Sequence, residues 1–205
     1  MDIPKAAADE TLVFRYIISS TEMRHIERAE RCVYLALAPD GRLHLRGEIP
    51  GCGEACHAEL ATLLLEYAMS CEGSPNAHFW PSARRAFAGP ISEAIAAAIA
   101  EHHPTATGEE RGRLALEALL VPKEGAVASP PAGARGSYQF AACPLCQAAA
   151  SGGTQRVAGM AHELFQQVCR TTVETAAPAW TVSFDDDLRR AGHALRLQLT
   201  RKTSP

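Results

Sequence analysis

The sequence has little that points to a membrane, to export or to nucleic acid. None of its 205 residues lies in a run of the ~18 consecutive apolar residues that a membrane-spanning helix needs. The N-terminus, MDIPKAAADE, carries acids and lacks the apolar run of a secretory signal. Its 20 Lys and Arg against 23 Asp and Glu give a net charge of -3, without the clustered cations that bind phosphate backbones. We therefore expect a soluble cytoplasmic protein with no nucleic acid and no membrane among its partners.

Signatures of several common enzyme classes are also missing. There is no Gly-x-Ser-x-Gly, no Gly-rich loop ending in Gly-Lys-Ser/Thr and no Gly-x-Gly-x-x-Gly. His162 and Glu163 do not begin a zinc-protease motif, because Gln166 stands where the second histidine is needed. These absences lower the expectation of catalysis but do not exclude it, since many enzymes lack such signatures.

Cysteine is present, in an odd number. Seven cysteines leave at least one thiol without an intramolecular disulfide, and the cytosol keeps thiols reduced. Cys32, Cys71 and Cys169 lie in strand or helix patterns, which predicts small core residues. The other four cysteines lie in two turns marked by Gly or Pro, so any cysteine chemistry is expected there.

Apolar periodicity predicts the elements of the N-terminal half. In order these are a strand over 11–20, a helix over 21–31, a hairpin of two strands over 32–38 and 42–49 with its turn at Asp40-Gly41, and a helix from 57 to 71. Residues 82–103 then predict one or two helices split at Gly89-Pro90, with Ile91, Ile95 and Ile99 in one stripe. His102 and His103 close this helix, where imidazolium groups would face exposed carbonyls.

The second half continues with another helix and a change of composition. The pattern predicts a helix over 108–121 with Leu114, Ala118 and Leu119 inward, a Pro/Gly-rich linker over 122–136, a strand over 137–142, a helix over 155–175, and strands over 180–184 and 193–200.

This order predicts an α+β fold, because strands and helices do not alternate regularly. We expect mainly antiparallel strands, namely an N-terminal strand plus β-hairpin and C-terminal strands, packed with about five helices. We expect one unit over 11–121, the linker over 122–136 and a second unit over 137–202. The alternative is that the two units form one domain.

The clearest local motif is Cys143-Pro144-Leu145-Cys146. Proline at the first position of a helix leaves the Cys143 sulfur near exposed N–H groups, which stabilise a thiolate. A thiol-redox site has this form. A thioredoxin-like domain needs more chain than the 59 residues after Cys146, and Gly152-Gly153 interrupts the helix that should follow. The alternative is that both thiols pack and cap the start of a helix.

The second motif is Cys52-Gly-Glu-Ala-Cys56-His57. Two thiols and an imidazole can converge on one cation, and Cys143 and Cys146 can join them if the fold brings the two turns together. Zinc is the metal that such ligands favour. The alternative is small buried cysteines with a surface histidine that opens a helix. Haem attachment is rejected, because three residues separate the two cysteines where two are usual.

Two functions remain open from the sequence. The first is a non-catalytic accessory protein that binds a protein or peptide partner. The outline of residues 11–121 resembles a peptide-recognition unit of the winged-helix type, in which an extended peptide adds to a sheet edge, and the strand over 11–20 is the expected edge. The alternative is a cysteine-dependent zinc or thiol-redox protein that uses Cys52, Cys56 and His57, Cys143 and Cys146, or both groups.

Overall fold

The computed structural model describes residues 11–18, 31–48, 57–58, 88–119, 127–128, 137–140, 155–185 and 195–203. Within these ranges the chain forms the strands β1 (Thr11–Ile18), β2 (Arg31–Leu37), β3 (Leu43–Glu48), β4 (His57–Ala58), β5 (Val127–Ala128), β6 (Ser137–Phe140), β7 (Trp180–Asp185) and β8 (Leu195–Arg201). Its helices in the same ranges are α3 (Gly89–His102), α4 (Gly108–Leu119) and α6 (Gln155–Ala176).

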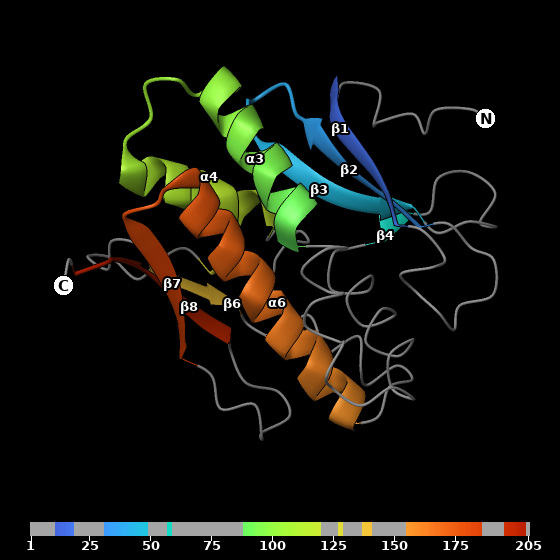
Figure 1. Ribbon diagram of the computed structural model, residues 1–205, viewed down its shortest axis with the longest axis vertical. Helices are drawn as coiled ribbons and strands as arrows, with labels where there is room; N and C mark the ends of the chain where they lie inside the picture. The colour runs from blue at the N-terminus through green and yellow to red at the C-terminus, as the bar shows by residue number, and fades with distance from the viewer. Residues whose placement is uncertain are drawn as a thin grey trace.

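The strands form two separate four-stranded sheets (Figure 1). The first has the order β1-β2-β3-β4 and the second the order β5-β6-β8-β7. Every pairing in both sheets is antiparallel. The expected mixture of helices with small antiparallel sheets is therefore confirmed. Three helices lie in the described residues, and residues 21–30 and 59–71 of the helices predicted over 21–31 and 57–71 fall outside them.

The hairpin of β2 and β3 is the element that local chemistry specifies best. Gly41 has a φ of 81°, a conformation that costs glycine little, and its N–H donates to the carbonyl of Ala38 at 2.9 Å. The Asp40 carboxylate accepts the N–H of Arg42 at 3.1 Å. Because the turn sets the register, Leu35 pairs with Leu45, as the alternating pattern predicts.

Two predicted helix ends are wrong. Arg31 is the first residue of β2 and pairs with Ile18, so it does not belong to the last turn of a helix. His57 and Ala58 form β4, where His57 pairs with Glu48, so His57 does not open a helix. A two-residue strand such as β4 has no alternating pattern of its own, and pairing with β3 decides its conformation. Within the predicted linker, Val127–Ala128 form β5 beside β6.

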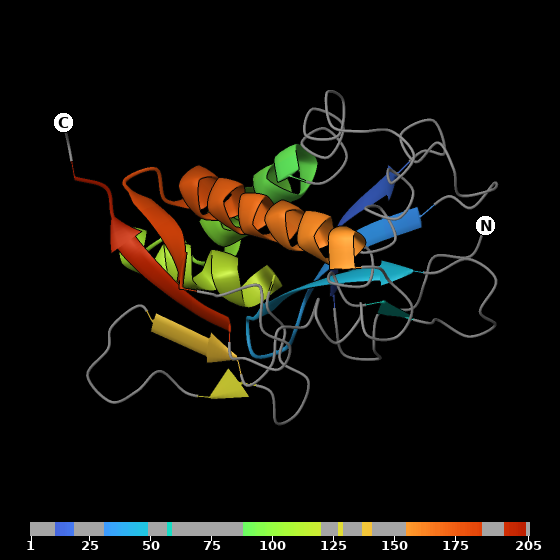
Figure 2. The same ribbon diagram turned by 90° about the horizontal axis from the view of Figure 1, so that it is seen from below.

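The three helices lie between the two sheets (Figures 1 and 2). α3 and α6 pack against one another, and α4 contacts β3 of the first sheet as well as β7 and β8 of the second. The helices therefore join both sheets, although the sheets share no strand.

The core lies where these helices meet. The predicted stripe of Ile91, Ile95 and Ile99 on α3 is confirmed, because none of the three side chains is more than 1% exposed. Burial of an isoleucine stabilises the fold by roughly 1.5–3 kcal/mol. On α4, Ala118 and Leu119 are buried as predicted, whereas Leu114 is only half-buried and Leu116 takes the central position.

Two glycines bring α4 close to the second sheet. A Cβ atom at Gly108 would lie 3.0 Å from the Trp180 Nε1, and one at Gly112 would lie 3.1 Å from both Cδ atoms of Leu199. Glycine at these positions, one turn apart, leaves room for side chains of β7 and β8.

No helix in the described part of the chain is long and apolar enough to span a membrane.

Candidate functional site

The predicted cysteine site falls largely outside the described residues. Cys52, Cys56, Cys143 and Cys146 lie there, and of His57 the structure describes the backbone, in β4. The CGEAC segment joins β3 to β4, and the CPLC segment joins β6 to α6. Among the described residues, no three His, Cys, Asp or Glu side chains form a group that could hold a metal. The zinc and thiol-redox interpretations stay predictions.

Cys169 is a core residue, as its place in the helix pattern predicts. The thiol is free and fully buried on α6, and this burial raises its pKa far above the usual range. Because the thiolate is the reactive form of cysteine, Cys169 is inert at neutral pH.

Three further polar side chains are buried on α3 and α6. Ser92 and Thr172 share a hydrogen bond of 2.9 Å between their hydroxyls, across the contact of α3 with α6. The Thr172 hydroxyl donates to the carbonyl of Val168 at 2.8 Å, so Ser92 donates to Thr172. His162 is also buried, at 2% exposure. All three side chains are therefore shielded from solvent.

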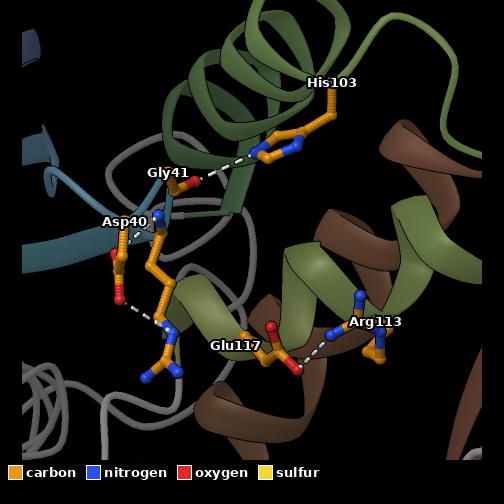
Figure 3. A network of polar contacts seen from close by, with 6 residues as sticks. Asp40, Gly41, His103, Arg113 and Glu117 are labelled. Carbon is orange, nitrogen blue, oxygen red and sulfur yellow. Dashed lines mark hydrogen bonds and ion pairs between the residues drawn. The ribbon is translucent and has the colours of Figure 1, made fainter.

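A histidine fixes the hairpin of the first sheet to α3 (Figure 3). His103, just after α3, donates from Nε2 to the carbonyl of Gly41 at 3.0 Å, so a ring proton sits on Nε2. The predicted contact of His103 with carbonyls of its own helix is thus replaced by a contact with the β2–β3 turn. The turn also lies near the start of β1, because Thr11 pairs with Leu37 just before the turn.

β1 is an edge strand of the first sheet. Among the described strands it pairs with β2 and with no other, and in Figure 1 it lies at the border of the sheet. A β-bulge at Val13 interrupts the pairing, because Leu12 pairs with Ala36 and Phe14 with Leu35. Residues 14–18 continue in regular register. This regular part is long enough to pair with one more strand of typical length.

The two faces of the first sheet carry different residues. Leu35, Leu43 and Leu45 lie on one face and are buried, and Ala36 on the opposite face is buried as well. α3 contacts β1, and α4 contacts β3. Phe14 shares the face of the three leucines because it pairs with Leu35. Residues at alternate positions occupy the opposite face, where Arg15, Tyr34 and Arg46 form one row across three strands.

β7, an edge strand of the second sheet, is partly closed. The Arg170 guanidinium of α6 donates from Nε to the carbonyl of Val182 at 3.4 Å and lies 5.4 Å from the centre of the Phe184 ring. Glu174, one turn further along α6, accepts the Thr181 hydroxyl at 2.7 Å and pairs with Lys202 at 3.3 Å. Charged groups beside an edge strand hinder the addition of another strand.

No family model, no curated protein and no solved structure matches this chain.

Sequence reasoning missed three features of this site. The bulge at Val13 has no local signal such as glycine, and it appears only in the register with β2. The contact of Arg170 with Val182 joins residues twelve positions apart in two different elements. The row of Arg15, Tyr34 and Arg46 was not predicted either, because it depends on the registers of β1 with β2 and of β2 with β3.

Proposed function

We propose that this protein is a non-catalytic accessory protein that binds an extended segment of a partner protein at the edge of β1. The observation that carries the proposal is the edge position of β1 together with the regular run of residues 14–18. An edge strand offers a row of N–H and C=O groups that an incoming strand can pair with. Main-chain hydrogen bonds would supply affinity, and alternate side chains would supply selectivity.

The choice of β1 over β7 rests on what lies beside each strand. Arg170 uses a carbonyl of β7, whereas no such side-chain bond to β1 occurs within the described ranges. β4 and β5, the outermost strands on the other sides, have two residues each. Two residues are too few for stable strand addition. β1 is therefore the best edge that the described residues offer.

The start of β1 has a second property that suits recognition. Leu12 is 38% exposed and is the exposed large apolar side chain among the described residues. It stands just before the bulge and the regular run. An incoming segment would cover it, and burial of apolar surface contributes roughly 25 cal/mol per Å².

The first experiment uses a photo-crosslinking amino acid in the full chain. It replaces Leu12 in one variant and Ser183, an exposed residue of β7, in a matched control. We expect one defined adduct from position 12 and none from position 183, with the partner identified by mass spectrometry. Equal adducts from both positions, or none from position 12, would overturn the proposal.

The second experiment tests strand addition with that purified partner. In an antiparallel edge strand, alternate residues direct their N–H toward the neighbouring strand and away from it. We compare two proline variants, Tyr16→Pro and Ile17→Pro, each with the alanine variant at the same position. Only one of the two prolines removes an N–H that bonds to β2, and the other removes an N–H that faces the added strand. The proline variant of this second kind should have nearly the same Tm as the alanine variant at its position, and it should bind the partner at least about tenfold more weakly. Equal affinity in this folded proline variant would contradict binding through the β1 edge.

A further inference from the structure

We infer that the segment bound at β1 carries an acidic side chain opposite Arg15, with apolar residues around it. This inference rests on the proposed function and adds the chemistry of the partner. It follows from the register of the first sheet, which places one charged residue within the regular run of β1.

The register places Arg15 beside the incoming strand. Arg15 pairs with Tyr34 of β2, and Tyr34 pairs with Arg46 of β3, so both arginines occupy one row on the face opposite Leu35. Directly opposed residues of neighbouring strands have Cβ atoms about 4.5–5.5 Å apart, and opposite charges in such pairs are favourable. A strand added to β1 would put one of its residues opposite Arg15. Arg46 would stand about three strand spacings away, roughly 14 Å.

The chain neighbours of Arg15 in β1 are aromatic residues. Its chain neighbours Phe14 and Tyr16 share the face that includes the buried Leu35. Ile17 is the next residue of β1 on the face of Arg15. Cross-strand pairs of aromatic or β-branched residues are favourable, so the partner positions on either side of the acid should be apolar.

A second copy of this chain fits the edge less well. Two copies could pair antiparallel through their β1 strands, related by a two-fold axis through the sheet. The register that pairs all of residues 14–18 is centred on Tyr16. In this register the two Arg15 residues lie diagonally across from each other. The register centred on Arg15 sets them directly opposite. Like charges in such pairs are destabilising. Charge complementarity therefore favours an acidic segment of another protein.

Three labelled peptides test this inference. Each has seven residues in which valine alternates with polar residues, with threonine at the outer polar positions and Glu, Gln or Lys at the central one. Binding to the full chain is measured by fluorescence anisotropy. We expect the Glu peptide to bind about threefold more tightly than the Gln peptide and about tenfold more tightly than the Lys peptide. The preference should shrink in high salt, which screens exposed charges.

Arg15→Glu and Arg46→Glu provide matched variants. Both reverse one charge in the same row, but only position 15 adjoins the added strand. We expect Arg15→Glu to reverse the order of the Glu and Lys peptides and Arg46→Glu to leave it unchanged. If Arg15→Glu does not fold, as judged by circular dichroism, Arg15→Gln should bring the Glu and Gln peptides to within about twofold of each other.

The outcomes separate this inference from the proposed function. Equal binding of the three peptides, or an unchanged order in Arg15→Glu, overturns the acidic partner and leaves strand addition intact. No binding of any peptide also overturns the inference as stated. The proposed function is decided separately, by the partner crosslinked at position 12 and by its loss of affinity for the folded proline variant.

Discussion

The same substitution at two helical glycines should change the stability of this protein in opposite directions. Gly112 lies in α4 and Gly159 in α6. A Cβ atom at Gly159 would meet no atom within 4 Å, whereas one at Gly112 would lie 3.1 Å from two carbons of Leu199. Because alanine adds one methyl group in both cases, the pair isolates the effect of the surroundings.

At Gly159 the gain in helix propensity should act alone. Glycine inside a helix is less favourable than alanine by roughly 0.5–1 kcal/mol, because the unfolded glycine chain has more conformations to lose. With open space around the new methyl group, no steric cost opposes this gain. We therefore expect Gly159→Ala to raise the free energy of unfolding by about 0.5–1 kcal/mol.

At Gly112 the same gain is outweighed by overpacking. Leu199 is 5% exposed, and its Cδ1 and Cδ2 are equally close to the new methyl group, so no single rotation of its χ2 angle moves both away. Forcing a methyl group into a packed core costs roughly 1–3 kcal/mol. Subtracting the propensity gain, we expect Gly112→Ala to lower the free energy of unfolding by about 1 kcal/mol.

Thermal and urea unfolding measure both variants. A change of 1 kcal/mol moves the Tm of a chain of this length by about 2–4 °C, so Gly159→Ala should melt higher and Gly112→Ala lower than the wild type. The double variant Gly112→Ala, Leu199→Val should lose less than the sum of the single variants, since valine makes room for the methyl group. A rise in Tm for both alanine variants, with additive energies in the double variant, would refute the close approach of α4 to β8.

Three further predictions concern a helix cap, a buried hydroxyl and the cysteine turns. Hydrogen bonds from Thr107 lower the pKa of the Glu110 carboxyl from its ordinary value of 4.5, so Glu110 stabilises the fold above the unfolded pKa and this contribution is lost as the pH falls through the folded one. The Tm difference between the wild type and Glu110→Gln should therefore be largest above pH 4.5 and should shrink as the pH falls below that value, and a constant difference would contradict this account. Ser92→Ala should cost about 1 kcal/mol in urea unfolding, because Thr172 keeps its second hydrogen bond, and a loss above about 3 kcal/mol would show a larger role for Ser92. If the cysteine turns bind zinc, elemental analysis of protein purified without chelator should find about one equivalent, which Cys143→Ser reduces, whereas less than a tenth of an equivalent removes the zinc interpretation.

Local chemistry in the sequence was sufficient for the elements that carry their own signal. Asp40-Gly41 predicts the β2–β3 turn because few residues adopt a positive φ, and the stripe of Ile91, Ile95 and Ile99 predicts both α3 and its buried face. Alternation within β1 indicates that Arg15 lies on the face opposite Phe14 and Tyr16, whereas its pairing with Tyr34 comes from the register of β1 with β2.

Only the tertiary structure decided which groups meet across elements. β4 at His57 exists because β3 pairs with it, and the bulge at Val13 exists only relative to β2. The contact of Arg170 with Val182, which makes β7 a poorer edge than β1, depends on where α6 packs. Gly112 has its role because Leu199 lies beside it. Periodicity tells which face of an element is apolar, but the partner of that face is set by packing between residues distant in the chain.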